Sequence, residues 1–219
     1  MSDIYCMQRF FKDIDIKKIK GVLVDFDNTL YEYAPCHKAG LEEAYSMYIQ
    51  KDPVSYDIFL DLYGSAQKEV KAKTLNQAAS HSRLLYFQKM IEMRDGATNV
   101  VESLKMEDVY WSAFIKTIQL RKEIIDFLAF CRKEGVKTCL ITDLTASVQF
   151  RKMVAIGVDT LVDYVVTSEE SGVEKPDQAI FALALSKLGL SGEDTVIIGD
   201  DKIKDIDGAR KLGIKGYMV

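Results

Sequence analysis

The sequence lacks any segment long and apolar enough to cross a membrane, since none approaches the ~18 apolar residues that a membrane helix requires. It also lacks an excess of charge of one sign: 29 lysines and arginines nearly balance 33 aspartates and glutamates, for a net charge of −4. A nucleic-acid-binding surface would require a basic patch, which this balance does not indicate. We therefore expect neither a membrane nor a nucleic acid as a partner.

Cysteines are few, and no two of them form a C-x-x-C pair. Cys6, Cys36, Cys131 and Cys139 are scattered through the chain, which is typical of reduced thiols in a cytosolic protein. Residues 1–18 contain no long apolar segment and carry acids early, so we expect no signal peptide. These features predict a cytoplasmic protein.

What the sequence does have is an ordinary globular composition, with 48% hydrophobic and 28% charged residues in 219. This length allows a sizeable core, as one domain or as a domain with an insertion. The apolar residues 22–24 predict a fully buried strand, typical of a parallel sheet. That strand ends in Asp25 and Asp27, and burying two neighbouring carboxylates is costly unless a cation or hydrogen-bond donors compensate.

The rest of the chain divides into a helical part and an alternating part. Residues 33–117 show helical periodicity and no candidate buried strand. Further on, we predict helices at 123–133, 146–155, 176–187 and 205–211, and strands at 136–141, 164–166, 195–198 and 214–219. Alternating strands and helices imply right-handed crossovers and a parallel sheet covered on both faces, which is an α/β fold.

The helical part behaves as an insertion, because the first two predicted strands lie much further apart than the ~30 residues of one βαβ unit. We predict a core domain from residues 1–32 and 118–219 and a helical domain from residues 33–117. The insertion follows the acid pair directly and is well placed to cover it. The simpler alternative is that it only adds core or an oligomer interface, and the sequence does not indicate an oligomeric state.

Three predicted strands end in polar residues: Asp25 and Asp27, Thr142 and Asp143, and Asp200 and Asp201. Parallel sheets bind ligands at the carboxyl ends of their strands. Asp25 and Asp200 are the natural ligands for Mg²⁺, which prefers oxygen donors. Lys175 and the residues around Thr142 instead favour an anion, through an ammonium group, a hydroxyl and backbone N–H groups. A phosphate ester satisfies both requirements.

The two acids are then expected to have different chemical roles. A nearby Mg²⁺ keeps Asp25 ionised, so it can attack phosphorus and form an aspartyl-phosphate. Asp27, if its carboxyl points away from the metal, can protonate the leaving oxygen and later activate water. Each signal alone is weak, because D-x-D pairs, Lys-Pro dipeptides and G-D-D turns are common. Their order along the chain is the informative feature.

In that order, DFDNTL at 25–30, LIT at 140–142, EKP at 174–176 and IGDDKIKDIDGA at 198–209 resemble the four motifs of the haloacid dehalogenase-like superfamily. The resemblance covers most of the chain. It implies a Rossmann-like doubly wound core with an inserted, mobile α-helical cap. It also implies a Mg²⁺-dependent phosphomonoester hydrolase that acts on a small phosphorylated metabolite: a sugar phosphate, a nucleotide or a phospho-acid.

The resemblance also implies roles for individual residues. Asp25 is the nucleophile, and Asp27 is the acid/base whose backbone carbonyl also binds Mg²⁺. Asp200 is a metal ligand, while Asp201 and Asp205 are expected to support the metal site. Thr142, Asp143 and Lys175 lie at the phosphate-binding positions. Many relatives carry Asn where this chain has Asp143, and an acid facing phosphate would weaken its binding. The family's dehalogenases lack the second acid, so Asp27 favours phosphoryl chemistry.

Three alternatives remain at this stage. A receiver-type signalling domain also combines acids, a Thr and a Lys, but neither the helical insertion nor the late G-D-D suits it. A catalytically silent binding protein with the same fold, or a phosphomutase, would share every motif. The substrate is not determined by the motifs, and the most polar cluster inside the insertion, His81 with Arg83, is the candidate substrate-binding group.

Overall fold

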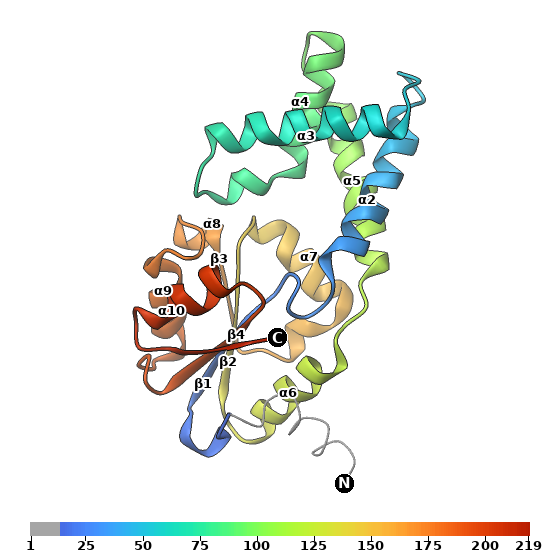
Figure 1. The fold of residues 1–219 in the computed structure, drawn as a ribbon. Helices are drawn as coiled ribbons and strands as arrows, with labels where there is room; N and C mark the ends of the chain where they lie inside the picture. The colour runs from blue at the N-terminus through green and yellow to red at the C-terminus, as the bar shows by residue number, and fades with distance from the viewer. Residues whose placement is uncertain (1–13) are drawn as a thin grey trace. The chain divides into compact units, whose positions relative to one another are not determined.

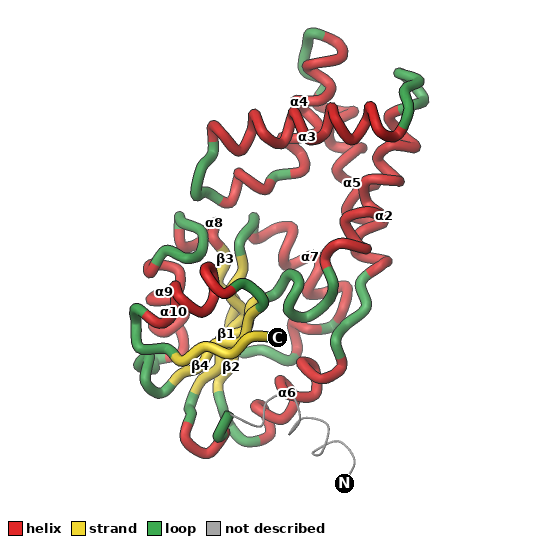
Figure 2. Tube along the Cα trace, viewed as in Figure 1, coloured by secondary structure: helices red, strands yellow, loops and turns green. Residues whose placement is uncertain are grey.

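A computed structural model of the protein describes residues 14–219 (Figures 1 and 2). The chain forms two compact units. The first combines the described residues up to Glu32 with Gln119–Val219, and the second comprises Tyr33–Ile118. Cys6 and the predicted absence of a signal peptide lie outside the described residues. Within the part that the structure describes, no helix combines the length and apolar character needed to span a bilayer.

The first unit is built on a parallel sheet of five strands in the order β3-β2-β1-β4-β5. The strands are β1 (Gly21–Asp25), β2 (Lys137–Thr142), β3 (Tyr164–Thr167), β4 (Thr195–Gly199) and β5 (Lys215–Met218). Every residue of β1 is buried, because β1 is the central strand. Asp25 pairs with Ile141 and Val24 with Ile198, so β1, β2 and β4 end at the same edge.

Helices cover both faces of this sheet, with α9 and α10 on one side and α6 and α7 on the other (Figure 1). The helical segments of the unit are η1 (Ile16–Lys18), α6 (Lys122–Lys133), α7 (Ala146–Ile156), η3 (Val158–Thr160), α8 (Ser168–Ser171), α9 (Gln178–Leu188), η4 (Lys202–Asp207) and α10 (Gly208–Arg210). One apolar core joins the strand side chains Leu23 and Ile197 to Phe181 of α9. The predicted Rossmann-like, doubly wound α/β fold is thus confirmed.

The second unit is entirely helical within the described residues. It comprises α2 (Tyr33–Tyr48), α3 (Tyr56–Lys73), η2 (Ala78–His81), α4 (Arg83–Asp95) and α5 (Val100–Thr117). The side chains of Ser55, Ser82 and Asn99 each accept a hydrogen bond from the backbone N–H three residues later, so the sequence itself starts α3, α4 and α5. α2 approaches α5 closely at Gly40, where a Cβ atom would lie 2.7 Å from the ring of Tyr110.

Several predicted details require correction. The helix expected at 176–187 begins at Gln178, because the Asp177 side chain caps it by accepting from Ala179 N. The segment expected as an α-helix at 205–211 is a π-helical turn, η4, followed by the short α10. The apolar Val101 fits the helical periodicity predicted for residues 33–117, yet it is exposed on α5, while Glu102 is buried. Glu102 is accommodated because it pairs with Lys51 and Arg94.

The described cysteines are structural. Cys36, Cys131 and Cys139 are buried, and none of them forms a disulfide within the described residues. Burial raises the pKa of both Cys131 and Cys139 to about 12, which keeps these thiols protonated and unreactive.

Candidate active site

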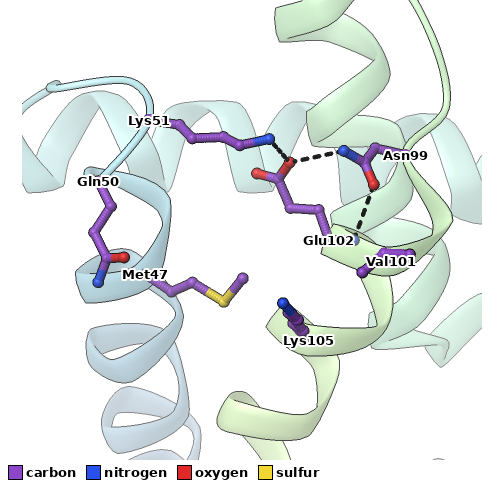
Figure 3. A pocket seen from close by; sticks show the side chains of 7 residues that line it. All are labelled: Met47, Gln50, Lys51, Asn99, Val101, Glu102 and Lys105. Atoms are coloured by element: carbon purple, nitrogen blue, oxygen red, sulfur yellow. Dashed lines mark hydrogen bonds and ion pairs between the residues drawn. The ribbon is translucent and has the colours of Figure 1, made fainter.

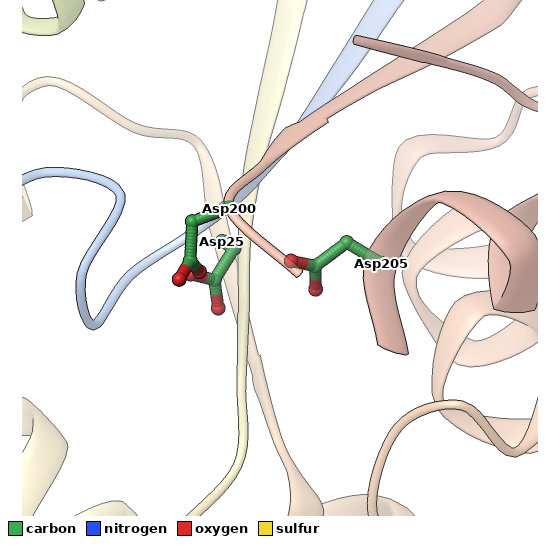
Figure 4. A group of neighbouring side chains, drawn as sticks. All are labelled: Asp25, Asp200 and Asp205. Carbon is green, nitrogen blue, oxygen red and sulfur yellow. The ribbon is translucent and has the colours of Figure 1, made fainter. Parts of the chain in front are cut away.

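Three acids meet at the carboxyl edge of the sheet (Figure 4). Asp25 ends β1, Asp200 follows β4, and Asp205 lies in η4; one carboxylate oxygen from each lies within 4.8 Å of the others. Asp205 was expected only in a supporting role, yet it belongs to this group. The close approach depends on Gly199, since a Cβ there would meet the Asp205 carboxylate. The group offers only oxygen donors, which suits a hard divalent cation.

Lys175 connects two of these acids. Its Nζ lies 2.5 Å from Asp25 Oδ1 and 2.7 Å from Asp205 Oδ1, and its side chain is buried. Burial alone would lower the pKa of Lys175, but the two carboxylates outweigh burial and raise this pKa. Burial also raises the pKa of Asp25 to about 7, although Lys175 opposes that shift. The group thus holds three carboxylates but only one ammonium, which contacts two of them, and the remaining negative charge favours a further cation.

Short hydrogen bonds orient the acids of this group. Thr29 Oγ1 donates to Asp25 Oδ2 at 2.7 Å, and Asn28 Nδ2 donates to Asp200 Oδ2 at 2.6 Å. Asn28 and Thr29 belong to the turn after β1, where Asn28 has a φ of +67°, a conformation that asparagine tolerates better than most residues. The turn therefore brings donors to acids on both strands.

Asp27 lies apart from this group and faces α7. Lys152 Nζ is 2.7 Å from Asp27 Oδ1, Gln149 Nε2 is 2.8 Å from Asp27 Oδ2, and the hydroxyl of Tyr31 donates to Oδ1. Burial, the largest single influence, would raise the pKa of Asp27, but the charge of Lys152 and the hydrogen bonds from Lys152, Tyr31 and Gln149 together lower this pKa. Sequence reasoning missed Lys152 and Gln149. Their signal was two polar residues one turn apart on a helix predicted to cover the sheet.

Thr142 and Asp143 lie at the end of β2, next to Lys175. Thr142 is buried, and its Oγ1 accepts a hydrogen bond from Gln149 Nε2. Asp143 Oδ1 accepts from the backbone N–H of Lys175 at 2.9 Å, and Asp143 Oδ2 lies 2.8 Å from Lys204 Nζ. The charge that made Asp143 problematic in the sequence is therefore balanced by Lys204, which sequence reasoning also missed.

Asp201 shapes the turn that carries Asp205. Its side chain accepts hydrogen bonds from the backbone N–H groups of Ile203 and Lys204, and its own N–H donates to Asp205 Oδ2 at 3.1 Å. It does not join the three-acid group. Its expected supporting role stays a prediction, and these contacts are consistent with it.

His81 and Arg83 belong to the helical unit, where Arg83 is buried with 5% of its surface exposed. It donates to the backbone carbonyl of His81 and to the hydroxyls of Tyr33 and Tyr110. Four aromatic rings, those of Tyr33, Tyr86, Tyr110 and Trp111, have centroids 5.5–6.0 Å from the guanidinium carbon. These hydroxyls, this carbonyl and these rings are the contacts found for Arg83 within residues 14–219, and none of them is with a carboxylate.

The same unit contains a second feature that the sequence did not indicate. An open hollow of about 280 Å³ lies between α2 and α5, with the side chains of Met47, Gln50, Lys51, Asn99, Val101, Glu102 and Lys105 around it (Figure 3). Lys51 and Asn99 both reach Glu102 in this hollow. Its lining lacks the convergent carboxylates found at the sheet edge.

Comparisons with known proteins identify the family of this chain. Residues 19–213 match the family model described as haloacid dehalogenase-like hydrolase. The ribulose-1,5-bisphosphate 5-phosphatase of Halopiger xanaduensis is 37% identical, over 90% of this chain and 83% of its own length. The glyceraldehyde 3-phosphate phosphatase of Methanocaldococcus jannaschii is 29% identical, over 90% and 82%. The crystal structure of a phosphatase from Thermococcus onnurineus shares the fold, with a TM-score of 0.70, 22% identity and coverage of 92% and 86%.

Proposed function

This chain belongs to the haloacid dehalogenase-like hydrolase family and is a phosphatase, and we propose that it hydrolyses the phosphate monoester of a small sugar through phosphorylation of Asp25. The observation that carries the mechanism is the contact of Lys175 with Asp25 beside Asp200 and Asp205. The two relatives are named for phosphorylated sugars, so a sugar phosphate is favoured over a nucleotide or another phospho-acid.

In the first step, a carboxylate oxygen of Asp25 attacks phosphorus and the bond from phosphorus to the ester oxygen breaks. Because Lys152 favours the ionised form of Asp27, this carboxyl first takes up a proton, which it then gives to the ester oxygen, so the sugar leaves as a neutral alcohol. In the second step, Asp27 takes a proton from water, whose oxygen attacks the aspartyl-phosphate. The bond between phosphorus and Asp25 breaks, and inorganic phosphate and the free carboxylate are restored.

The neighbouring residues hold the phosphate during both steps. We infer that Lys175 Nζ and the Thr142 hydroxyl contact the phosphate oxygens, and that Asp143 contributes its backbone N–H. Asp25 and Asp200, with the backbone carbonyl of Asp27, are the residues that would hold a divalent cation such as Mg²⁺, which supplies charge neutralisation at the phosphate when bound. Asp25 and then Asp205 raise the pKa of Lys175, so both carboxylates keep its ammonium charged, and Asp205 also orients it through a 2.7 Å contact.

The test is phosphate release from a panel that contains ribulose 1,5-bisphosphate, glyceraldehyde 3-phosphate, a nucleoside monophosphate and p-nitrophenyl phosphate. We expect release that requires Mg²⁺, stops with excess chelator and is fastest with a sugar phosphate. Asp25→Asn should lower turnover by at least ~10⁴-fold while the protein stays folded, because the nucleophile is lost but not the shape.

Asp194→Asn is the matched control, because Asp194 pairs with Lys20 just before β4, at the opposite edge of the sheet. It should leave turnover unchanged. Full activity of Asp25→Asn would refute the covalent mechanism. Transfer of phosphate to a second sugar hydroxyl, with none released, would instead identify a mutase.

A further inference from the structure

Helix α7 presents two buried polar side chains to the active site. Lys152 and Gln149 are both 0% exposed and lie one turn apart on the same helix face. A fully buried ammonium is costly unless a carboxylate compensates its charge, and Asp27 does so at 2.7 Å. The Lys152 ammonium also lies 3.2 Å from the Tyr31 hydroxyl and 5.6 Å from the ring centroid of Phe26.

Each oxygen of the Asp27 carboxylate has its own donor from α7. Oδ1 receives Lys152 Nζ, and Oδ2 receives Gln149 Nε2 at 2.8 Å. Two donors on one rigid helix, one for each oxygen, fix both the direction of the side chain and the rotation of its carboxylate plane. A single contact would leave that rotation free.

The amide of Gln149 indicates that this orientation is not merely a result of packing. Its Nε2 points toward Asp27 Oδ2, Thr142 Oγ1 and the backbone carbonyl of Asp143, whereas its buried Oε1 has no hydrogen-bond partner within the described part of the chain. An orphaned buried oxygen is unfavourable, and such groups are uncommon unless they serve a purpose. Here the amide nitrogen links the proposed acid/base to the proposed phosphate-binding hydroxyl.

We propose that Lys152 and Gln149 are positioning residues that hold the Asp27 carboxyl for proton transfer to the leaving oxygen. Lys152 acts through Asp27 alone. Gln149 acts through Asp27 and also through Thr142, so it additionally affects phosphate binding. This inference rests on the proposed function, since it assigns both residues to the proton transfer of that reaction.

The test compares two esters whose leaving groups differ. A sugar alkoxide needs a proton to leave, whereas p-nitrophenolate leaves readily without one. Lys152→Met should lower kcat/KM for the sugar phosphate by about 10²-fold, the scale of a displaced catalytic group, and that for p-nitrophenyl phosphate by less than about three-fold. Arg151→Met, on an exposed neighbouring position of α7, is the matched control and should change neither value.

A second comparison keeps the test decisive if Lys152→Met fails to fold. Asp27→Asn with Lys152→Met removes both charges, and it should be no slower on the sugar phosphate than Asp27→Asn alone. Gln149→Leu should show the same preference for the aryl ester and also a raised KM for both esters. These two variants do not leave the uncompensated Asp27 charge that Lys152→Met would create.

Equal losses on the two esters in Lys152→Met, or a further loss when it is added to Asp27→Asn, would overturn the proposal. Either result would mean that Lys152 supports the fold rather than the proton transfer. A wild-type protein inactive on both esters would instead refute the proposed function. An active wild type whose variants show no ester preference would refute only the positioning role.

Discussion

The two units of this protein accommodate buried positive charge in different ways. In the α/β unit, Lys175 touches Asp25 and Asp205, Lys152 touches Asp27, and the less buried Lys204 touches Asp143. In the helical unit, Arg83 is as buried as Lys175 but meets only aromatic rings, hydroxyls and a backbone carbonyl within the described residues. Each of these lysines meets a carboxylate, whereas the helical unit pairs Arg94 with the buried Glu102 but holds Arg83 among polarisable groups alone.

This difference is informative because buried ion pairs are poor stabilisers: the cost of desolvation offsets much of the attraction. Four cation–carboxylate contacts, made by three lysines near one edge of the sheet, are therefore better explained by chemistry that handles charge than by stability. The Arg83 site has no such excess of acids. Cation–π contacts and hydrogen bonds with neutral acceptors can hold a guanidinium without creating a second buried charge.

The largest difference in stability is expected when Lys175, a buried cation paired with carboxylates, is replaced. Lys175→Met leaves the buried Asp25 and Asp205 carboxylates without their ammonium and should lower the free energy of unfolding by about 3–5 kcal/mol. Lys187→Met on α9 is the control, since Lys187 pairs with the more exposed Glu170, and it should cost less than about 1 kcal/mol. Urea unfolding measures both, and equal losses would contradict the comparison.

The second prediction concerns pH and His37, which hydrogen-bonds to Tyr110 through Nδ1 at 2.6 Å. Burial, and then the charge of Arg83, lower the pKa of His37 to about 4. Above about pH 6.5 the folded and unfolded forms are both neutral at His37, so this residue adds no pH dependence. As pH falls from about 6.5 to 4, only the unfolded chain gains the proton, and about 3 kcal/mol of stability should be lost.

His37→Gln tests this, because glutamine retains a polar contact for Tyr110 but does not titrate. The difference in unfolding free energy between wild type and variant should move in favour of the variant on going from about pH 7.5 to pH 4.5. A difference that stays constant with pH would show that His37 is protonated as easily in the folded protein as in the unfolded chain.

A smaller loss of stability is expected when Arg83, which has no carboxylate contact within the described residues, is replaced. Arg83→Met leaves no uncompensated charge, only hydroxyls and a carbonyl that lose a donor, so we expect about 1–2 kcal/mol, well below the effect of Lys175→Met. The pKa of His37 should rise, since the Arg83 charge is gone, and NMR titration would measure this. Lys73→Met, on the exposed surface of α3, serves as the control.

If Arg83→Met lowered the free energy of unfolding as much as Lys175→Met does, the four aromatic rings around Arg83 would stabilise a cation as strongly as carboxylates do. An increase in KM for a sugar phosphate beyond that of Lys73→Met would support the substrate-binding role predicted for His81 and Arg83.

The smallest effects are expected at the partly exposed pair of Asp143 and Lys204. Lys204→Met should change stability by less than about 1 kcal/mol, but it leaves an uncompensated acid beside the phosphate-binding residues and should raise KM several-fold. Asp143→Asn should have little effect alone and should restore KM when combined with Lys204→Met. A double variant as poor as Lys204→Met alone would mean that Lys204 contacts the substrate directly.

Much of the α/β unit was predictable because its signals are local. Each strand at the sheet edge is a short apolar run followed by a polar residue, and parallel strands place such residues at a common edge whatever lies between them. Asp25, Thr142 and Asp200 could therefore be brought together from the order of elements alone. The inclusion of Asp205 could not, because it depends on the π-helical turn of η4 and on Gly199.

Helical periodicity was less informative about which side chains are buried. Val101 fits an apolar helix face but is exposed, while Glu102 beside it is buried and pairs with Lys51, in the turn after α2, and with Arg94 of α4. The sequence indicated Arg83 only as a candidate substrate-binding residue, and the structure surrounds it with aromatic residues, three of them more than 25 residues away along the chain. Such outcomes depend on partners that a local pattern does not contain.

By itself, the sequence determined the alternation of strands and helices, the helical insertion, and the acids, hydroxyl and lysine at the strand ends, because these follow from local periodicity and the geometry of a parallel sheet. Only the tertiary structure decided how their charges are compensated: Lys152 and Gln149 with Asp27, Lys204 with Asp143, and an aromatic cage around Arg83. Electrostatic compensation acts between groups a few ångströms apart in space, and those groups lie up to 125 residues apart along the chain.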